Sequence, residues 1–349
     1  MGHVASPVTM RTLADRLGIS VTTVSNAYSK PDRLSPDLRD QILATAKELG
    51  YCGPSAAGRA LRSGKTDVCG FLFGGELAEA FADPYTVAFL AGLSETAEKF
   101  GASILLLRSP GDGDDAESQL LQRAAIDAIV TCSATSEHPA TELLTQRGVR
   151  VVGAQRAEVG DWVAVNDVKA GRLIGKHLAK LGHRQIVVVV TGETPDGEAY
   201  EITPKELTAV AGRFAAERFQ GLAEKLPEAT FRIVCGGYKP KQAGRLAAAQ
   251  ALDVQDRPTA IIAMSDALAL GVWDAVRERG LTPGRDISIT GFDDIQDAAF
   301  VGLTTVRQPI ADKGRFAGRL AMDPDYPQRQ ITLPVELVVR SSTGPAPRI

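Results

Sequence analysis

Short hydroxyl and amide side chains gather in the segment GISVTTVSNAYS, which runs from Gly18 to Ser29. Such groups can hydrogen-bond phosphate oxygens and base edges, and Asn26 could pair with an adenine through two hydrogen bonds. The methyl groups of Val21 and Thr22 could contact a thymine methyl. The segment therefore has the chemistry to read double-stranded DNA, although a polar helix face in another kind of small domain would show the same pattern.

A second group of polar side chains follows predicted strands in the long remainder of the chain. Ligands of parallel sheets bind outside the carboxyl ends of the strands, and carboxylates and amides there suit hydroxyl-rich ligands such as sugars or nucleosides. Helix capping is the alternative role for each carboxylate, and Asp266 and Asp293 both stand where N-caps belong. The candidates are Asp83, Tyr85, Asn166, Asp167, Asp266, Asp293 and Asp294.

No catalytic or metal-binding set stands out in the sequence. The four histidines are scattered, the four cysteines include no C-x-x-C pair, and no G-x-S-x-G motif or phosphate-binding glycine loop is present. Asp293 and Asp294 are adjacent on one loop, which does not make an acid/base dyad. We therefore expect no enzyme activity, no cofactor and no metal site.

Two short helices joined by a tight turn are predicted to position the DNA-reading side chains. Thr9 can cap a helix over Met10–Leu17, and Gly18 can end it because glycine adopts the left-handed conformation easily. Ser20 can then cap a second helix over Val21–Tyr28. This order of helix, turn and helix is the helix-turn-helix layout.

A third helix and a hinge are expected to complete this N-terminal head. Ser35 can cap a helix over residues 36–49, and Gly53-Pro54 then breaks the chain. A short helix over Ser55–Leu61 would be marginal alone, so we expect it to fold when held by a partner or by DNA. Leu61 stands between Arg59 and Arg62, as a minor-groove wedge would. A plain flexible linker is the alternative that the sequence alone favours.

Beyond residue 67, apolar strands alternate with amphipathic helices. The alternation predicts parallel sheets with helices on both faces, and its restart near residue 186 predicts two lobes with a ligand between them. The predicted strands are Val68–Phe73, Ile104–Leu107, Ala128–Val130, Val151–Ala154, Trp162–Val165, Ile186–Val190, Phe231–Cys235, Ala260–Ala263 and Ile287–Thr290. The predicted helices include Tyr85–Phe100, Glu117–Ala125, Ala170–Leu181, Ala211–Leu226, Lys241–Leu252 and Ala267–Arg279.

Charge is distributed unevenly along the 349 residues, whose net charge is −3. Residues 1–66 hold nine Lys/Arg and five Asp/Glu, a balance of +4, and the remainder carries −7. A basic head on an acidic body indicates DNA binding confined to the head, although chance variation could give the same asymmetry. No stretch reaches the roughly 18 apolar residues of a membrane span, so we expect a cytoplasmic protein without a membrane partner.

The chain resembles the lactose-repressor (LacI/GalR) family of bacterial transcriptional regulators over essentially its full length. The segment TLADRLGISVTTVSNAYSKPDRLSPDLRDQILATAKELGY is similar to the family's DNA-binding domain, and RALRSGKT is similar to its hinge. The body carries DPYTVAFLAGLSETAEKFG, NDVKAGRLIGKHLAKLGHRQI, ERFQGL, PTAIIAMSDALALGVWDAVRERGLTPGRDISITGFDD, LTTVRQP and LPVELVVRSST. Many motifs in the right order make the match specific.

The resemblance implies an N-terminal all-α helix-turn-helix head and an α/β two-lobed, periplasmic-binding-protein-like body with parallel sheets. It implies an effector-responsive regulator, expected to be a repressor, that binds near-palindromic double-stranded operator DNA as a homodimer or as a tetramer built from dimers. It also implies that a small polar effector, such as a sugar or nucleoside, binds between the lobes. The hinge helix is expected to order on DNA.

The resemblance also assigns residues by position. Arg218 corresponds to an effector-binding arginine, whose fork of donors suits a hydroxylated or anionic ligand. The DNA-contacting set that we predict is Thr9, Ser20, Val21, Thr22, Thr23, Ser25, Asn26, Ser29, Tyr51, Gly58, Arg59, Leu61 and Arg62. The effector-contacting set is Asp83, Tyr85, Gln155, Asn166, Arg218, Tyr238, Asp266 and Asp293.

The chain departs from the family pattern at four single residues and in one longer stretch. Gly53 adds one residue before the hinge, and Asn26 and Ser29 differ from the best-known members, so the operator sequence cannot be copied from them. The stretch 192–212 is longer than the usual loop and could form a lid or lengthen the helix before Arg218. Gln155 stands about where some members carry an effector-binding aspartate.

The predicted domains are a DNA-binding head at 1–52, a hinge at 53–66 and an effector-binding body at 67–349. The lobes are assigned roughly to 67–160 with 306–325, and to 161–305 with 326–349. A solute-binding protein of a transporter would share this body, but it predicts a signal peptide where this chain has a DNA-binding head. A sugar-processing enzyme predicts a catalytic cluster that the sequence does not show.

Overall fold

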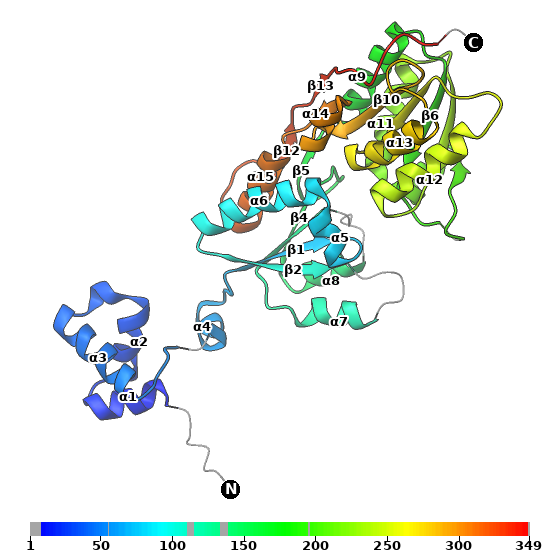
Figure 1. The fold of residues 1–349 in the computed structure, drawn as a ribbon. Helices are drawn as coiled ribbons and strands as arrows, with labels where there is room; N and C mark the ends of the chain where they lie inside the picture. The colour runs from blue at the N-terminus through cyan, green and yellow to red at the C-terminus, as the bar shows by residue number, and fades with distance from the viewer. Residues whose placement is uncertain (1–7, 55, 110–114, 133–138, 195, 348–349) are drawn as a thin grey trace. The chain divides into compact units, whose positions relative to one another are not determined.

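The computed structural model describes residues 8–54, 56–109, 115–132, 139–194 and 196–347. Contacts divide the chain into two compact units, residues 1–66 and residues 67–349. The first unit is the all-α head, and the second is the α/β body (Figure 1). Among the described residues, no helix is both long enough and apolar enough to cross a membrane.

The head consists of helices whose ends are set by local hydrogen bonds. Thr9 caps α1, its hydroxyl accepting from the Thr12 amide at 3.2 Å, and Gly18 ends that helix in the left-handed region at φ 65°. Ser20 caps α2 by accepting from the Thr23 amide at 3.0 Å. The helices are α1 (Met10–Leu17), α2 (Val21–Ser29), the 3-10 turn η1 (Pro31–Arg33), α3 (Pro36–Glu48) and α4 (Ala56–Ser63).

A small core holds α1, α2 and α3 together. Val24 and Ala27 of α2 are buried in it, as their spacing on one helix face predicts. The rings of Tyr28 and Tyr51 meet edge to face with centroids 6.0 Å apart. The other buried members are Leu13, Ala14, Ile42 and Ala46. Because α2 buries only one face, its opposite face remains available for recognition.

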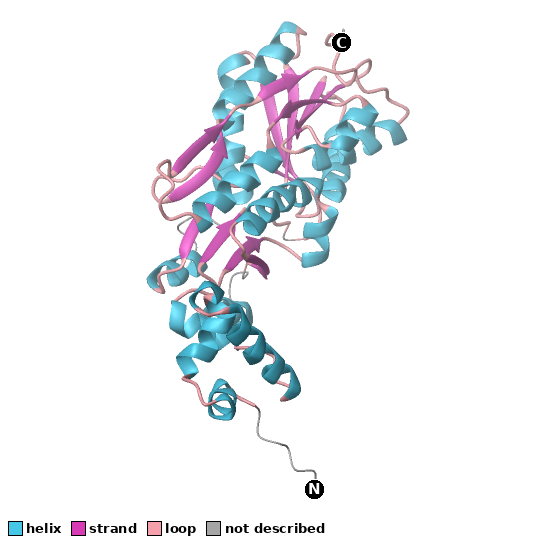
Figure 2. Cartoon of the chain, turned by 90° about the vertical axis from the view of Figure 1, so that its left-hand side faces the viewer, coloured by secondary structure: helices cyan, strands magenta, loops and turns pink. Residues whose placement is uncertain are grey.

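The body contains two sheets, each flanked by helices (Figure 2). The first sheet is entirely parallel, and the second is parallel except for its two antiparallel edge strands, β7 and β13. The first sheet runs in the order β12 (Gln330–Leu333), β5 (Asp161–Val165), β4 (Arg150–Gly153), β3 (Ala128–Thr131), β1 (Val68–Phe73) and β2 (Ser103–Arg108). The second runs β13 (Glu336–Val338), β11 (Thr304–Arg307), β10 (Ser288–Asp293), β9 (Ala260–Ala263), β6 (Gln185–Val190), β8 (Thr230–Cys235) and β7 (Tyr200–Ile202).

The helices of the body connect these strands. In Figure 1, α6 and α15 lie against each other beside the first sheet, although more than 200 residues separate them in the chain. The helices are α5 (Leu77–Ala82), α6 (Pro84–Lys99), α7 (Asp115–Arg123), α8 (Pro139–Gln146), α9 (Asp167–Lys180), α10 (Leu207–Ala211), α11 (Arg213–Lys225), α12 (Pro240–Leu252), α13 (Asp266–Glu278), α14 (Gln296–Val301) and α15 (Ile310–Met322).

The lobe boundaries predicted from the sequence are wrong for two strands. The strand β5 was assigned to the second lobe, but it pairs with β4 in the first sheet. The strand β12 was also assigned to the second lobe, but it pairs with β5. The chain crosses between the lobes after β5, after β11 and after β12, and the alternation of strands and helices carries no information about such crossings.

The helices α9 and α11 touch backbone to backbone. A Cβ atom at Gly171 would lie only 2.0 Å from the carbonyl oxygen of Arg218, so no larger residue fits there without moving a helix. The contact brings Arg218, in the middle of α11, beside the first turn of α9. The position of this arginine therefore depends on a glycine 47 residues earlier in the chain.

The long stretch 192–212 is built into the edge of the second sheet. It contributes β7, which pairs antiparallel to β8, and the short helix α10, which Gly212 separates from α11. Ile202 of the strand is buried, and Leu207 of α10 is fully buried. These apolar contacts anchor the segment to the lobe, and α11 itself begins only at Arg213.

Candidate DNA interface and effector site

The outward face of α2 carries most of the predicted DNA-reading side chains. Val21 and Thr22 are exposed, and Ser25 and Asn26 are half-buried. The Asn26 amide has no hydrogen-bond partner among the described residues, which leaves its donor and acceptor for a ligand. The Ser29 hydroxyl is exposed and donates to the Ser25 carbonyl at 2.9 Å, so its oxygen can still accept.

Two other predicted residues of this set act as helix caps. The Thr23 hydroxyl lies 2.8 Å from the Ser20 hydroxyl, and Ser20 in turn accepts from the Thr23 amide. Thr9 caps α1 in the same way. These caps fix the N-terminal ends of α1 and α2, and their hydroxyl groups are already engaged with the head itself.

The hinge helix α4 presents a large apolar side chain to solvent. Leu61 is 88% exposed, and the half-buried Gly58 lies one turn before it. The side chains of Arg59 and Arg62 lie outside what the structure describes. A leucine this exposed contributes little packing to the head, which is the state expected of a side chain that acts on a partner.

Arg218 is the centre of a buried polar cluster at the carboxyl ends of the second sheet. Its Nε donates to Asp167 Oδ1 at 2.8 Å, and its Nη1 donates to the Met264 carbonyl at 2.6 Å. The guanidinium lies over the Phe292 ring, 3.3 Å from its centroid. Both partners of the ion pair are buried, with about a tenth of each side chain exposed. The pair is compensated internally and holds the guanidinium in one orientation.

Asp266 is fully buried and ties three segments together. Its carboxylate accepts from the Thr305 hydroxyl at 2.6 Å and from the Ile295 amide at 3.0 Å. It does not cap α13, because Ser265 is the N-cap of that helix. Asp293 is not a helix cap either, because Ile295 stands at the N-cap of α14. Helix capping, the alternative role considered from the sequence, therefore explains neither Asp266 nor Asp293.

The protonation of Asp266 makes a testable contribution to stability. Burial raises the pKa of Asp266 to about 7. The folded protein therefore keeps a proton on this carboxyl group at pH values where the unfolded chain has already released it. The stabilisation of the folded state by this proton is complete below the unfolded pKa of about 4, and it is lost as the pH rises through about 7. We expect Asp266→Asn to flatten the fall in unfolding free energy across that range, measured by urea unfolding at a series of pH values. Asp297→Asn, which alters an exposed carboxyl group, is the control, and equal slopes in wild type and Asp266→Asn would contradict the assignment.

The turn after β10 has unusual backbone geometry. Asp293 and Asp294 both have positive φ angles, 121° and 60°. Such conformations cost free energy in residues other than glycine and persist where the surroundings hold them. Here Arg307 Nε and Arg340 Nη2 each donate to the Asp294 carboxylate at 2.6 Å. The turn thereby holds Asp293 in the buried cluster, where its Oδ1 accepts from Gln308 Nε2 at 2.6 Å.

The first lobe contributes a second buried cluster that faces the first. Lys313 of α15 donates to the Tyr85 hydroxyl of α6 at 3.1 Å. Burial raises the pKa of Tyr85 well above its usual range, and Asp293 of the second lobe adds to this. Burial also lowers the pKa of Lys313, whereas the carboxyl groups of Asp167 and Asp293 in the second lobe raise it. The two clusters are therefore close enough to influence each other electrostatically.

The remaining predicted effector residues make contacts outside the hydrogen bonds of these two clusters. Asp83 caps α6, accepting from the Thr86 amide at 3.1 Å, and Asn166 caps α9, accepting from the Lys169 amide at 2.8 Å. Gln155 donates to the Cys132 carbonyl at 2.9 Å. Tyr238 is largely exposed. The structure therefore brings Tyr85, Arg218, Asp266 and Asp293 into the facing clusters and leaves Tyr238 on the surface.

Two buried residues of the clusters, Lys313 and Gln308, are absent from the predicted set. A signal for Lys313 was present, because it shares one face of α15 with Ile310, Ala317 and Leu320, all of which are buried. A lysine on an apolar helix stripe is unusual, since lysine is rarely buried without a partner. Gln308 follows β11 and carried no comparable signal.

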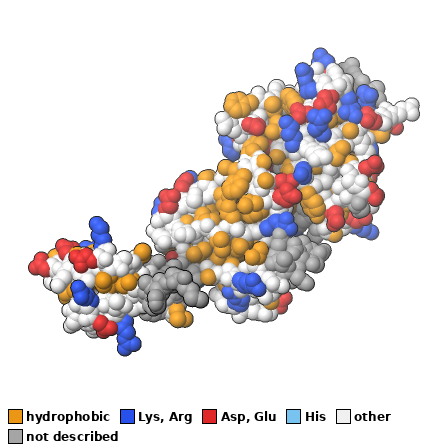
Figure 3. Space-filling model, turned by 60° about the horizontal axis from the view of Figure 1, so that its bottom comes forward, with side chains coloured by type: hydrophobic (Ala, Val, Ile, Leu, Met, Phe, Trp, Pro, Cys, Tyr) orange, Lys and Arg blue, Asp and Glu red, His pale blue; other side chains and the backbone are white. Residues whose placement is uncertain are grey.

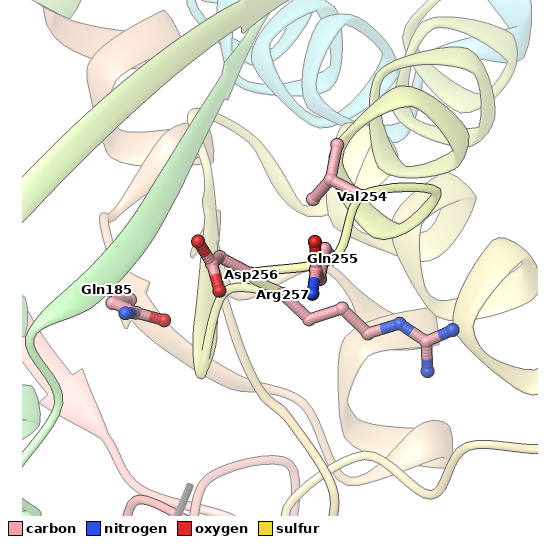
Figure 4. Close-up of a pocket in the computed structure, with 5 residues that line it drawn as sticks. All are labelled: Gln185, Val254, Gln255, Asp256 and Arg257. Atoms are coloured by element: carbon pink, nitrogen blue, oxygen red, sulfur yellow. The ribbon is translucent and has the colours of Figure 1, made fainter.

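A pocket of about 390 Å³ lies elsewhere on the second lobe (Figure 4). It is lined by Gln185, at the first residue of β6, and by residues 254–257, which precede β9. It therefore opens at the amino ends of these strands, away from the carboxyl ends where ligands of parallel sheets bind. We do not assign the effector to it.

Comparisons with known proteins cover both units. A periplasmic binding protein-like domain family matches residues 176–343. An HTH-type transcriptional regulator from Mycolicibacterium smegmatis is 33% identical, with 98% of each chain covered. The HTH-type transcriptional repressor PurR of Proteus mirabilis is 29% identical, also with 98% of each chain covered. The crystal structure of a LacI-family transcriptional regulator from Corynebacterium glutamicum shares 28% identity at a TM-score of 0.70, covering 97% of this chain and 98% of that one.

Proposed function

Because the chain belongs to the LacI family of HTH-type transcriptional regulators, we propose that it is a repressor whose operator binding is controlled by a small effector. The strongest support is that a single chain joins a helix-turn-helix head to a body with two facing buried polar clusters. The head supplies the reading side chains, and the clusters supply donors and acceptors for a polar ligand.

In this proposal, α2 enters the major groove and α4 contacts the minor groove. Val21, Thr22, Ser25, Asn26 and Ser29 contact bases and phosphates, and Leu61 inserts at the centre of a near-palindromic operator. Thr9 and Ser20 act mainly by capping, which places helix N-termini toward phosphates, and Thr23 supports the Ser20 cap. Tyr51, Gly58, Arg59 and Arg62 complete the proposed contact set.

The effector is proposed to bind between the facing clusters. Arg218, Asp293 and Tyr85 come from both lobes, so a ligand that contacts them changes the relative stability of lobe arrangements. It can shift operator affinity only by its differential affinity for the arrangements that favour and disfavour DNA binding. The fixed orientation of Arg218 favours a hydroxylated or acidic ligand.

We also infer that two copies of the chain pair through the first lobe. Its helices α5 and α6 and its edge strand β2 expose Leu77, Phe81, Val87 and Leu105 to solvent. Figure 3 shows hydrophobic side chains gathered on one face of the body. A second copy would cover such side chains, and a dimer would match two half-sites of an operator.

Fluorescence anisotropy with the native promoter tests the proposal. We expect the full chain to prefer this DNA over random DNA of equal length by at least about a thousandfold, with affinity that falls steeply as salt rises. An Asn26→Ala variant should lose much of the preference, because it removes a side chain that can read a base. Binding that is insensitive to salt, or equal affinity for both DNAs, would refute the proposal.

A further inference from the structure

Lys313 is a buried ammonium group without a counterion among the residues that the structure describes. Only 6% of its surface is exposed, and its described hydrogen bond is to the neutral Tyr85 hydroxyl at 3.1 Å. No carboxylate of the described residues forms an ion pair with it. A lysine carries three donors, so two remain for another acceptor. Burying an ammonium group in this way is costly unless an opposite charge arrives.

The carboxylates in and around the two clusters are engaged with other groups. Asp167 is paired with Arg218 at 2.8 Å, and Asp83 accepts from the first turn of α6. Burial raises the pKa of Asp293 well above its usual range, which favours its neutral form. The two facing clusters therefore contain one cation, Arg218, that is already neutralised and another, Lys313, that is not.

Gln308 supplies an unused acceptor close to Asp293. Its Oε1 atom is buried and has no hydrogen-bond partner among the described residues, while its Nε2 donates to Asp293. A buried acceptor without a partner is uncommon in folded proteins. A ligand hydroxyl group would satisfy it, so this side of the cluster suits a neutral donor, whereas the Lys313 side suits an acceptor with negative charge.

We propose that Lys313 recognises an acidic group of the effector, and that the effector is a hydroxylated small molecule bearing a carboxylate or a phosphate. The inference rests on the proposed function, because it specifies the ligand of the same site. Gln308 Oε1 accepts from a hydroxyl group of this ligand, and Tyr85 holds the Lys313 ammonium in position. Lys313 thereby discriminates acidic ligands from their uncharged counterparts.

Thermal unfolding of the full chain with simple anions tests the proposal without an identified effector. Inorganic phosphate and acetate are titrated against chloride at constant ionic strength and near-neutral pH. A ligand that binds the folded state raises its unfolding temperature. We expect phosphate or acetate to stabilise the wild type, and Lys313→Met to need about tenfold more anion for the same shift, since hydrogen bonds to charged groups contribute to binding on that scale. The more effective anion identifies a phosphate or a carboxylate ligand.

Two further variants keep the outcome interpretable. Lys176→Met removes an exposed lysine from α9 and should respond to the anions as the wild type does. Tyr85→Phe keeps the ring but removes the hydroxyl, and it should weaken the anion response several-fold even if Lys313→Met does not fold. Equal anion dependence of the wild type, Lys313→Met and Tyr85→Phe, or no stabilisation of the wild type beyond chloride, would overturn the proposal. Operator binding of the same preparations is measured separately, so that loss of the proposed function is distinguished from loss of anion recognition.

Discussion

Replacing Leu61 with alanine is expected to weaken binding to the specific operator by about a hundredfold, while binding to random DNA changes little. The side chain is 88% exposed, so its truncation removes no packing from the head. A hundredfold loss of affinity corresponds to about 2.7 kcal/mol of binding free energy. We attribute this loss to the insertion of Leu61 between base steps, because the inserted side chain stabilises bent DNA only where the bend permits further contacts. Random DNA is held mainly through phosphates and should not depend on the wedge.

Anisotropy titrations with operator and random duplexes at the same salt concentration measure both affinities. Leu120→Ala is the matched control, because it removes an equally large exposed side chain from α7 in the body. Circular dichroism should show an unchanged unfolding temperature for both variants. An equal loss of affinity for the two duplexes would show that Leu61 is an ordinary linker residue.

Replacing Arg218 with methionine is expected to destabilise the body by about 3–5 kcal/mol. The change leaves Asp167 as a buried carboxylate without its 2.8 Å partner and removes the donor to the Met264 carbonyl. An uncompensated buried charge costs more than the lost ion pair itself contributes. Urea unfolding of the full chain, followed by a probe of the body, measures the loss.

A neighbouring ion pair provides the control for this prediction. Arg172 and Glu224 join the same two helices at 2.6 Å, but both side chains are substantially exposed. Arg172→Met should therefore cost far less stability than Arg218→Met, because solvent screens this exposed pair. The double variant Arg218→Met, Asp167→Leu should recover much of the stability, because it removes both buried charges, yet it should remain unresponsive to effector. If Arg218→Met is no less stable than Arg172→Met, the pair does not support the fold as described.

The head could be predicted almost completely from the sequence. Thr9, Gly18 and Ser20 set helix ends through hydrogen bonds and backbone conformations that span only a few residues. The helix predicted over Met10–Leu17 is the one observed. Signals of this kind are local, and the chain carries them wherever it folds. The hinge is the exception, because the sequence alone favours a plain flexible linker where the structure has the helix α4.

The strands of the body were also foreseeable, but their partners were not. Val68–Phe73 and Ala260–Ala263 are observed as predicted, because short apolar runs between turns mark buried strands. Pairing between strands is a separate matter, and β5 joins the first sheet through contacts that its own residues do not specify. The family resemblance supplied Arg218 and Asp266, yet it did not reveal that Asp266 ties three segments or that Lys313 is buried.

The sequence by itself thus determined the helix ends, the strands and the types of side chain available for recognition, because these depend on residues within about one helical turn. Only the tertiary structure decided which charges are paired and which are not. Arg218 meets Asp167 across 51 residues, and Lys313 meets Tyr85 across 228. Burial and pairing at such separations arise when whole lobes pack, through close helix contacts such as the one at Gly171, so the electrostatics of the site follow from the assembled fold.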